Sequence, residues 1–378
     1  MKIAYIAAST VPSNAANSIA VMKACQAMVQ LGHQVHLFVP VCESQPDVNL
    51  QEFYGLQTSF PIEWLSANIR LRRYDLGLQA VRRARALQAD LIYTRLPQAA
   101  LFAPLSGIPI IMEVHNPPEG RFGPYLFRLL LHLPGKKRLL PITHAMAELL
   151  RNRGLPLETP DGRLSFVISP SGIDLERYAN LPEPPAARRM LGLADMPTAV
   201  YTGHLYAGRG TTLLAALARR LPAVQFLWIG GRESDVHVWR NRLLAEHLTN
   251  VHLTGFIQNS LLPRYQAAAD VLLMPYERVI AVSSGGNTAG HASPMKMFEY
   301  MACRRAILSS DLPVLREVLN EHNAVFCPPE DLDAWQATLE SLLANESRRS
   351  TLANQAWQDV QPYTWLERQR RVLEGFLR

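Results

Sequence analysis

Residues 1–40 read MKIAYIAASTVPSNAANSIAVMKACQAMVQLGHQVHLFVP and alternate between short apolar runs and a helical pattern. KIAYIA (2–7) is a short apolar run that ends at polar residues, which is typical of a buried strand. Residues 18–33 carry apolar side chains at helical spacing up to Gly32, and VHLFVP (35–40) is a second apolar run. Strand, helix and strand within 40 residues predict a βαβ unit and therefore a parallel sheet.

The same alternation continues along the chain and restarts after LPEPPAARR (181–189), a proline-rich segment that we expect to be a linker. We therefore predict an α/β fold of two doubly wound domains with a cleft between them. The N-terminal domain would span 1–180 and the C-terminal domain 181–360, with a closing helix in 361–378. Ligands of parallel sheets lie beyond the carboxyl ends of the strands, so the loops that follow strands are the place to search for a site. The further strands are expected at 89–95, 108–115, 141–143, 165–170, 198–204, 224–231, 250–256, 269–276, 306–310 and 324–329.

Composition narrows the possible partners. The 378 residues carry a net charge of +6, which favours anionic ligands or an anionic membrane surface but is too small to argue for nucleic acid. The four cysteines form no CxxC pair and lack zinc-ligand spacing, so we expect reduced thiols in a cytoplasmic protein. The N-terminus does not resemble a signal peptide, and no apolar run reaches the roughly 18 residues of a membrane span.

The stretch HASPMKMFEYMACRRAILSSDLP (291–313) has the apolar spacing of a buried helix but also carries charge within its first two turns, at Lys296 and Glu299. Ser293 is a good N-cap and Pro294 a good first helical residue, and an apolar stripe follows. A helix N-terminus favours phosphate, and Lys296 adds a full positive charge there. Glu299, one turn later, can accept hydrogen bonds from two hydroxyl groups. The pattern therefore predicts a site for a nucleoside diphosphate with its ribose. The alternative is an exposed Lys–Glu pair of small effect.

The segment SPMKMFEYMACRRAILSSDLP resembles the signature of the retaining, nucleotide-sugar-dependent glycosyltransferases of the GT-B fold, family 4 type. GHLYAGRG (203–210), VHLTGFIQNSLLPRYQAAADVLLMPY (251–276) and SPSGIDLERY (169–178) resemble further family segments. The resemblance covers nearly the whole chain. It implies two Rossmann-like domains, a nucleotide diphosphate sugar as donor, transfer with retention, and a closing helix that packs back on the first domain. It also implies that no metal and no cofactor beyond the donor substrate is needed.

The resemblance also assigns roles to single residues. Arg209 and Lys296 would hold the donor diphosphate, and Glu299 would bind the ribose. His115, in EVHNPP (113–118), would position the transferred sugar or stabilise charge, so that His115, Arg209 and Lys296 form the catalytic set. The remaining donor-side candidates are Gly203, Ile257, Ser293, Pro294 and Met295.

Three positions depart from the family pattern. His204 stands where the family usually has arginine. His291 stands in place of the first of two family glutamates, and it either donates to a sugar hydroxyl or is a solvent-facing loop histidine. In the first loop, Ala15 and Ala16 replace a Gly-Gly pair. Asn14, Ala16 and Asn17 are candidates for acceptor or phosphate contacts.

Metal and membrane contacts have weaker signals. Asp331 and Asp333 form an Asp-x-Asp at a helix start, where capping is favoured over metal binding, so no metal site is predicted. Two basic, partly apolar segments, 69–88 and 122–140, favour peripheral contact with the inner face of a membrane. The alternative is that both are ordinary covering helices.

We therefore predict transfer of a sugar to a hydroxyl of a polysaccharide, glycolipid or small molecule. Two rival functions stay open. One is a nucleotide-sugar epimerase of the same architecture, and the other is a non-catalytic nucleotide-sugar-binding subunit, suggested by His204 and His291. The donor base, the sugar, the acceptor and the oligomeric state are not encoded in recognisable motifs.

Overall fold

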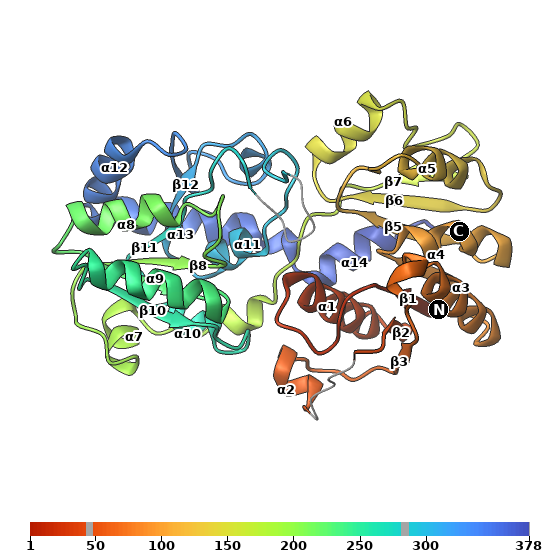
Figure 1. Cartoon of the computed structure of the whole chain (residues 1–378), viewed down its shortest axis with the longest axis horizontal. Coiled ribbons are helices and arrows are strands. Elements are labelled where there is room, and N and C mark those ends of the chain that lie inside the picture. The colour runs from red at the N-terminus through yellow and green to blue at the C-terminus, as the bar shows by residue number, and fades with distance from the viewer. Residues whose placement is uncertain (43–47, 281–286, 378) are drawn as a thin grey trace. The chain divides into compact units, whose positions relative to one another are not determined.

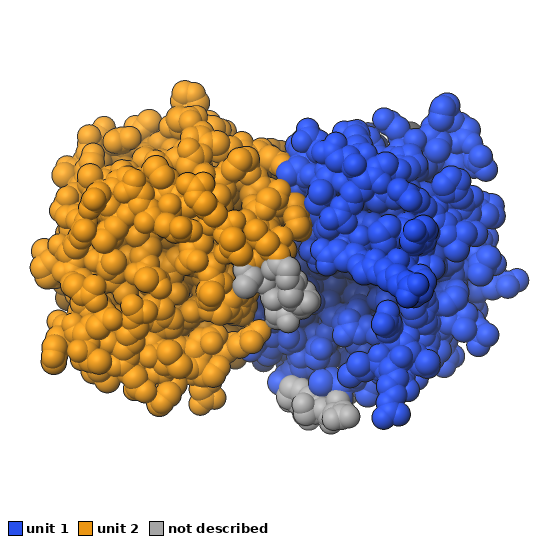
Figure 2. Space-filling view, turned by 45° about the horizontal axis from the view of Figure 1, so that its top comes forward, with its two compact units in different colours: residues 1–172, 365–378 blue, residues 173–364 orange. Residues whose placement is uncertain are grey.

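The computed structural model describes residues 1–42, 48–280 and 287–377, and the chain forms two compact units (Figure 2). Unit 1 is Met1–Gly172 together with Trp365–Arg378, and unit 2 is Ile173–Thr364. The chain thus changes units at 172/173 and 364/365, where the sequence analysis placed boundaries at 180/181 and 360/361. A Cβ on Gly172 would lie 2.6 Å from the Trp365 ring, so this crossing requires a glycine.

Unit 1 is built on a seven-stranded parallel sheet in the order β3-β2-β1-β4-β5-β6-β7 (Figure 1). Its strands are short and apolar, as expected for strands buried on both faces of a sheet. They are β1 (Lys2–Ile6), β2 (Gln34–Pro40), β3 (Ile62–Leu65), β4 (Leu91–Thr94), β5 (Ile110–Val114), β6 (Lys137–Pro141) and β7 (Leu164–Phe166).

The helices of unit 1 cover the sheet. One core cluster joins alternate strand residues, such as Ile6 and Ile92, to apolar side chains of α3, α4, α5 and α6. Helix α14 packs against α1 within the same unit. The helices are α1 (Ala16–Gln30), α2 (Leu50–Tyr54), α3 (Tyr74–Ala86), α4 (Pro97–Phe102), α5 (Gly123–His132), α6 (His144–Asn152) and α14 (Trp365–Leu373).

Unit 2 repeats the architecture with a six-stranded parallel sheet in the order β10-β9-β8-β11-β12-β13. Its strands are β8 (Thr198–Thr202), β9 (Gln225–Ile229), β10 (Val251–Gly255), β11 (Val271–Met274), β12 (Ala306–Ser310) and β13 (Val325–Cys327). Its helices are α7 (Pro184–Met190), α8 (Thr211–Arg220), α9 (Glu233–Ala245), α10 (Leu262–Gln266), α11 (Met295–Ala302), α12 (Leu332–Ala344) and α13 (Glu346–Val360). The predicted fold of two Rossmann-like units is confirmed.

Each sheet has one point where the strand order reverses. In unit 1 the order turns between β1 and β4, and in unit 2 it turns between β8 and β11. Loops that leave the carboxyl ends of two such strands diverge, and the crevice between them is where doubly wound sheets bind ligands. The loops after β1 and β4, and those after β8 and β11, are therefore the places to examine.

Short segments of the fold differ from the sequence-based expectations at some points and agree at others. The expected linker 181–189 is wrong as a linker, because Pro184 starts helix α7 inside unit 2, in the first turn, where proline is tolerated. Asp331 caps α12 by accepting from the Ala334 amide at 3.0 Å, which confirms the capping prediction. The expected strand 141–143 overlaps β6 only at Pro141, the last residue of a strand that begins at Lys137. Among the described residues, no helix has the length and apolar character needed to cross a bilayer.

Two of the basic residues in the 122–140 segment are internal to unit 1. The Lys137 ammonium is buried and donates to the carbonyls of Leu133 and Gly135. Arg138 donates to the carbonyls of Val372 and Glu374, each at 2.8 Å. These two charges therefore tie β6 to neighbouring backbone rather than form an exposed basic patch.

Candidate active site

Helix α11 begins one residue later than the sequence predicts. Pro294 has extended backbone angles, φ −70° and ψ 125°, and it is the N-cap residue without a side-chain cap. Ser293 as N-cap is therefore wrong, because proline fixes φ but leaves ψ free to be extended. Met295 and Lys296 then lie in the first turn, whose backbone N–H groups favour an anion.

The ammonium of Lys296 is buried without a hydrogen-bond acceptor. The residue is 8% exposed, and its Nζ has no hydrogen-bond partner among the described residues. It lies 4.4 Å from the ring centroids of both Tyr201 and Tyr276. Burial lowers the pKa of Lys296 well below its usual value, and Arg209 lowers it further. A buried cation without a partner is costly, so this geometry indicates a group prepared for an anionic ligand.

The loop between β8 and α8 brings the side chains of Arg209 and His204 to this place. Arg209 donates from Nη1 to Tyr276 Oη at 3.2 Å and from Nη2 to Tyr206 Oη at 2.8 Å. His204 stacks on Tyr206 with 5.0 Å between ring centroids. Burial lowers the pKa of His204, and the Arg209 charge adds to that effect. Within the described chain, Arg209 Nε and His204 Nδ1 are buried atoms without partners.

Gly203 leaves space beside the ammonium of Lys296. A Cβ at this position would lie 3.0 Å from Tyr201 Oη and 3.5 Å from Lys296 Nζ. Its φ of +146° also favours glycine. Gly203 follows β8 directly, and Tyr276 follows β11, so the group flanks the reversal point of the unit 2 sheet. The structure thus brings together four of the candidates: Gly203, His204, Arg209 and Lys296.

Glu299 lies one turn further along α11. It is 6% exposed and accepts a long hydrogen bond of 3.4 Å from Gln266 Nε2. Burial raises the pKa of Glu299, and the Arg177 charge opposes this rise. Arg177 comes from the 3-10 helix η3 (Leu175–Tyr178) and donates to Asn259 Oδ1 at 2.7 Å. A carboxylate offers about four lone-pair sites, so Glu299 retains capacity for hydroxyl donors.

The other unit 2 candidates have different settings. His291 is 8% exposed, so it is not a solvent-facing loop histidine, and its amide donates to the Thr288 carbonyl at 3.1 Å. Ser293 is half-buried just before α11. Ile257 follows the edge strand β10, which β9 separates from β8, so the structure does not group it with Lys296.

In unit 1, His115 belongs to a charged network around the buried Glu113. His115 Nε2 lies 2.7 Å from Glu113 Oε2, and Arg95 Nη2 lies 3.2 Å from His115 Nδ1. Arg95 Nε and Arg368 Nη2 also contact this carboxylate, at 3.2 and 3.0 Å. Tyr93 donates its hydroxyl to Glu113 Oε1 at 2.6 Å. The two guanidinium groups and His115 hold the pKa of Glu113 well below its usual value, against the effect of burial.

Arg95 connects His115 to the first loop. Its Nη1 donates to the carbonyl of Asn17 at 3.1 Å, at the point where the strand order reverses between β1 and β4. Asn14 and Ala16 are exposed, and Ala16 is the first residue of α1. Asn17 is exposed as well, and only its backbone carbonyl is linked to His115, through Arg95.

We expect His115 to remain neutral over most of the acidic range. Burial and the Arg95 charge lower its pKa from 6.5 to about 4. The unfolded chain therefore binds this proton first, and the folded state loses stability as the pH falls from 6.5 to about 4. We expect the unfolding free energy of the wild type, measured in denaturant, to fall relative to that of His115→Gln as the pH drops from 6.5 to about 4. From about pH 7 to 9 the difference between the two proteins should stay constant. A difference that does not change with pH contradicts this.

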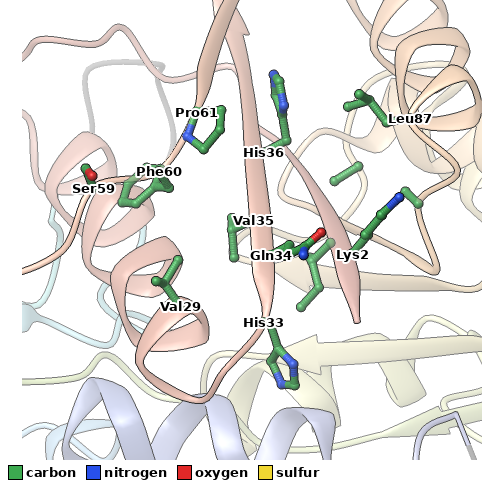
Figure 3. Close-up of a pocket in the computed structure, with 13 residues that line it drawn as sticks. Lys2, Val29, His33, Gln34, Val35, His36, Ser59, Phe60, Pro61 and Leu87 are labelled. Atoms are coloured by element: carbon green, nitrogen blue, oxygen red, sulfur yellow. The ribbon is translucent and has the colours of Figure 1, made fainter.

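A cavity of about 440 Å³ lies elsewhere in unit 1 (Figure 3). Its lining comes from the amino ends of the strands, including Lys2 of β1, Gln34 and His36 of β2, and Pro61 just before β3. None of the predicted site residues lines it. Because parallel sheets bind ligands at the carboxyl ends, this cavity is separate from the candidate site.

Sequence reasoning missed the residues that hold these groups in place. Tyr276 and Arg95 each stand within two residues of the carboxyl end of a strand, and that position was an available signal. Gln266 and Arg368 had no such signal, because they lie inside helices and act through partners far away in the sequence. These four are additions to the predicted set.

The chain matches two protein families, and the two matches together cover most of it. "Glycosyltransferase Family 4" matches residues 19–177, and "Glycosyl transferases group 1" matches residues 196–345. Among solved structures, Anabaena HepE in complex with UDP has a TM-score of 0.73 and 17% identity over 99% of both chains. Sucrose-phosphate synthase from Thermosynechococcus elongatus has a TM-score of 0.75 and 18% identity over 98% of this chain and 96% of that one. These two likenesses concern the fold.

Two curated relatives are similar in sequence. A phosphatidyl-myo-inositol mannosyltransferase of Mycolicibacterium smegmatis is 27% identical over 202 residues, 52% of this chain and 47% of that protein. A D-inositol 3-phosphate glycosyltransferase of Xylanimonas cellulosilytica is 26% identical over 222 residues, 55% of this chain and 50% of that protein. The match thus spans about half the length of each. The chain belongs to the glycosyltransferases of the GT-B fold, family 4 type.

Proposed function

We propose that this chain transfers a sugar from a nucleotide diphosphate sugar to an acceptor hydroxyl, with the diphosphate held in unit 2. One observation carries the proposal: the buried ammonium of Lys296 lacks an acceptor, and the unpartnered Arg209 Nε and His204 Nδ1 belong to the same group of side chains in the described chain. The Lys296 ammonium and Arg209 Nε, both donors without an acceptor among the described residues, fit an anion with several oxygens at the reversal point of a parallel sheet. Glu299 would accept the ribose hydroxyls.

The chemistry follows from the charge that develops. The bond from the anomeric carbon to the diphosphate breaks, and a new bond forms from that carbon to the acceptor oxygen. Negative charge grows on the departing diphosphate, where Arg209, Lys296 and the first amides of α11 stabilise it. We propose that the acceptor attacks from the same face and passes its proton to a diphosphate oxygen, which retains the anomeric configuration. His115 is proposed to position the transferred sugar.

The positive groups of unit 2 suggest that the reaction needs no metal ion. Lys296 and Arg209 supply full positive charges on side chains, as a bound divalent cation does in other phosphate sites. We therefore propose a metal-independent reaction without a further cofactor. The relatives suggest the first donors to try, because HepE has been solved with UDP and with UDP-glucose and the mycobacterial relative is named a mannosyltransferase.

The function is tested by following a nucleotide sugar with the purified chain, using water as a slow acceptor and then candidate hydroxyl acceptors. We expect release of the nucleoside diphosphate, a product with the donor's anomeric configuration by proton NMR, and undiminished rates in EDTA. Conversion of one nucleotide sugar into another without diphosphate release would instead identify an epimerase. Nucleotide binding without any turnover would identify a non-catalytic subunit.

We also propose a peripheral membrane contact through unit 1. Helix α5 exposes an apolar row at helical spacing, with Tyr125 68% exposed and Leu129 51%, and Phe122 just before the helix is 60% exposed. Arg121 and Arg128 lie next to this row in the sequence. Aromatic side chains beside basic ones favour an anionic bilayer surface.

Vesicle sedimentation tests this contact. The wild type should pellet with vesicles that contain about 30% anionic lipid and should be released by salt, since the attraction is partly electrostatic. Tyr125→Glu should abolish pelleting, whereas Val238→Glu, at an exposed position of unit 2, should not. Equal pelleting of both variants, or no pelleting of the wild type, contradicts the proposed contact.

A further inference from the structure

Three tyrosines surround the two cations of the proposed diphosphate site. Lys296 Nζ lies 4.4 Å from the ring centroids of Tyr201 and Tyr276. The guanidinium carbon of Arg209 lies 5.0 Å from the ring centroid of Tyr206 and 5.4 Å from that of Tyr276. The negative faces of aromatic rings attract cations, and more strongly when water is excluded. The rings therefore stabilise both charges, and among the described residues Lys296 Nζ and Arg209 Nε keep donors without an acceptor.

Tyr276 contacts both cations, and the other two tyrosines contact one each. Its ring faces Lys296, and its hydroxyl accepts from Arg209 Nη1 at 3.2 Å. The hydroxyl of Tyr201 is engaged elsewhere, because it donates to the carbonyl of His204 at 2.6 Å. Tyr276 is 3% exposed, so both of its contacts are largely shielded from water.

The backbone around Tyr276 is fastened to the loop that carries Arg209. The amide of Glu277 donates to the Gly208 carbonyl at 3.3 Å, and the amide of Gly210 donates to Glu277 Oε1 at 3.2 Å. A Cβ on Gly210 would lie 1.8 Å from the carbonyl oxygen of Pro275, so only glycine permits this approach. These contacts hold the backbone of Tyr276 next to the loop that carries Arg209.

We propose that Tyr276 is a positioning residue that sets the spacing of Lys296 and Arg209, so that a diphosphate meets a preformed pair of cations. This inference rests on the proposed function, because Tyr276 would position the two cations of the proposed diphosphate site. A preformed pair loses less side-chain entropy on binding than two free side chains do. Tyr276→Phe removes the hydrogen bond to Arg209 but keeps the ring beside both cations, and Tyr276→Leu removes the ring contacts as well.

The test uses inorganic pyrophosphate as the probe, titrated calorimetrically into the full chain at low salt. We expect an affinity loss of about tenfold for Tyr276→Phe and of about a hundredfold for Tyr276→Leu, in line with one charged hydrogen bond and one desolvated cation–π contact. Tyr300→Phe is the matched control. Its hydroxyl bonds to the Thr202 amide at 2.8 Å and the Leu273 carbonyl at 3.2 Å, so it should lower the melting temperature but keep the affinity.

A double-mutant cycle separates positioning from a general structural role. If Tyr276 acts through Arg209, Tyr276→Phe should have no further effect on pyrophosphate affinity in the Arg209→Met background. A loss of equal size in both backgrounds, or no loss in the wild-type background, overturns the inference and leaves the proposed function standing. If the wild type does not bind pyrophosphate, the anion site itself is refuted, and the role of Tyr276 is refuted with it.

Discussion

Replacing Lys296 by methionine will abolish diphosphate binding and will also raise the melting temperature of the ligand-free protein. The ammonium is buried and has no acceptor among the described residues, so the empty site carries an uncompensated charge. Methionine keeps the length and apolar stem of the side chain and removes that charge. We expect a gain of about 1–2 kcal/mol, or roughly 2–8 °C, and an affinity loss of about a hundredfold or more.

The gain in stability on replacing Lys296 follows from the direction in which burial shifts the pKa of its ammonium. Burial holds the pKa of Lys296 below 10.5 in the folded state, so the unfolded chain binds this proton more tightly. The resulting loss of stability is absent at high pH, grows as the pH falls below 10.5, and reaches its full size once the pH is below the folded-state pKa. Melting curves at pH 7 and 10 should therefore show a larger advantage of Lys296→Met at pH 7.

A second buried lysine provides the control. Lys137 is 3% exposed, but its ammonium donates to backbone carbonyls, including Gly135 at 3.0 Å. Lys137→Met should lower the melting temperature, because it leaves those carbonyls without their donor. The account of Lys296 fails if both substitutions destabilise to the same extent, or if Lys296→Met still binds the nucleotide.

Replacing Arg368 by leucine will destabilise unit 1 by about 3–5 kcal/mol, the usual cost of breaking a buried ion pair on one side. Arg368 is 3% exposed and lies on α14, near the end of the chain. Its guanidinium contacts Glu113 at 3.0 Å, Tyr93 Oη at 3.2 Å and the Pro170 carbonyl at 2.8 Å. The substitution removes these contacts together and leaves the Glu113 carboxylate with fewer partners.

Hydrogen exchange read by mass spectrometry localises the effect of Arg368→Leu. Amides of β5 should exchange faster, whereas those of β8 in unit 2 should be unchanged. Arg370→Leu is the matched control on the same helix, because Arg370 is exposed and pairs with Glu367, and it should change stability by less than about 0.5 kcal/mol. Adding Glu113→Gln to Arg368→Leu should recover part of the loss, since it removes the stranded charge. Unchanged exchange in β5 would show that the network does not stabilise unit 1.

The parts of this fold that could be predicted from the sequence are those with a local signal. KIAYIA and VHLFVP could be predicted as buried strands, because a short apolar run between polar ends is typical of a strand in a parallel sheet. Lys296 and Glu299 stood out because charge on an otherwise apolar helix demands a reason, and the structure buries both. In contrast, a proline in a proline-rich stretch can either break or begin a helix. In the folded chain Pro184 begins helix α7.

The features that could not be predicted from the sequence depend on contacts between residues far apart in the chain. The charge state of His115 is set by Glu113 and Arg95, and Glu113 in turn contacts Arg368, 255 residues further along the chain. Arg138, in a segment that resembled a basic surface, likewise donates to the carbonyls of Val372 and Glu374, more than 200 residues further along the chain. A single sequence contains no pattern that joins such positions, because their spacing is fixed by the order of strands in the sheet.

The side chains around Lys296 are proposed to bind the diphosphate of a nucleotide sugar. The most direct measurement is the melting temperature of the wild type, Lys296→Met and Glu299→Gln with UDP, GDP, ADP, dTDP and their sugars. A ligand that binds only the folded state raises the melting temperature. We expect one of these nucleotides to raise the melting temperature of the wild type, with the rise lost in Lys296→Met and reduced in Glu299→Gln. No rise with any of them, or an equal rise in all three proteins, would contradict it.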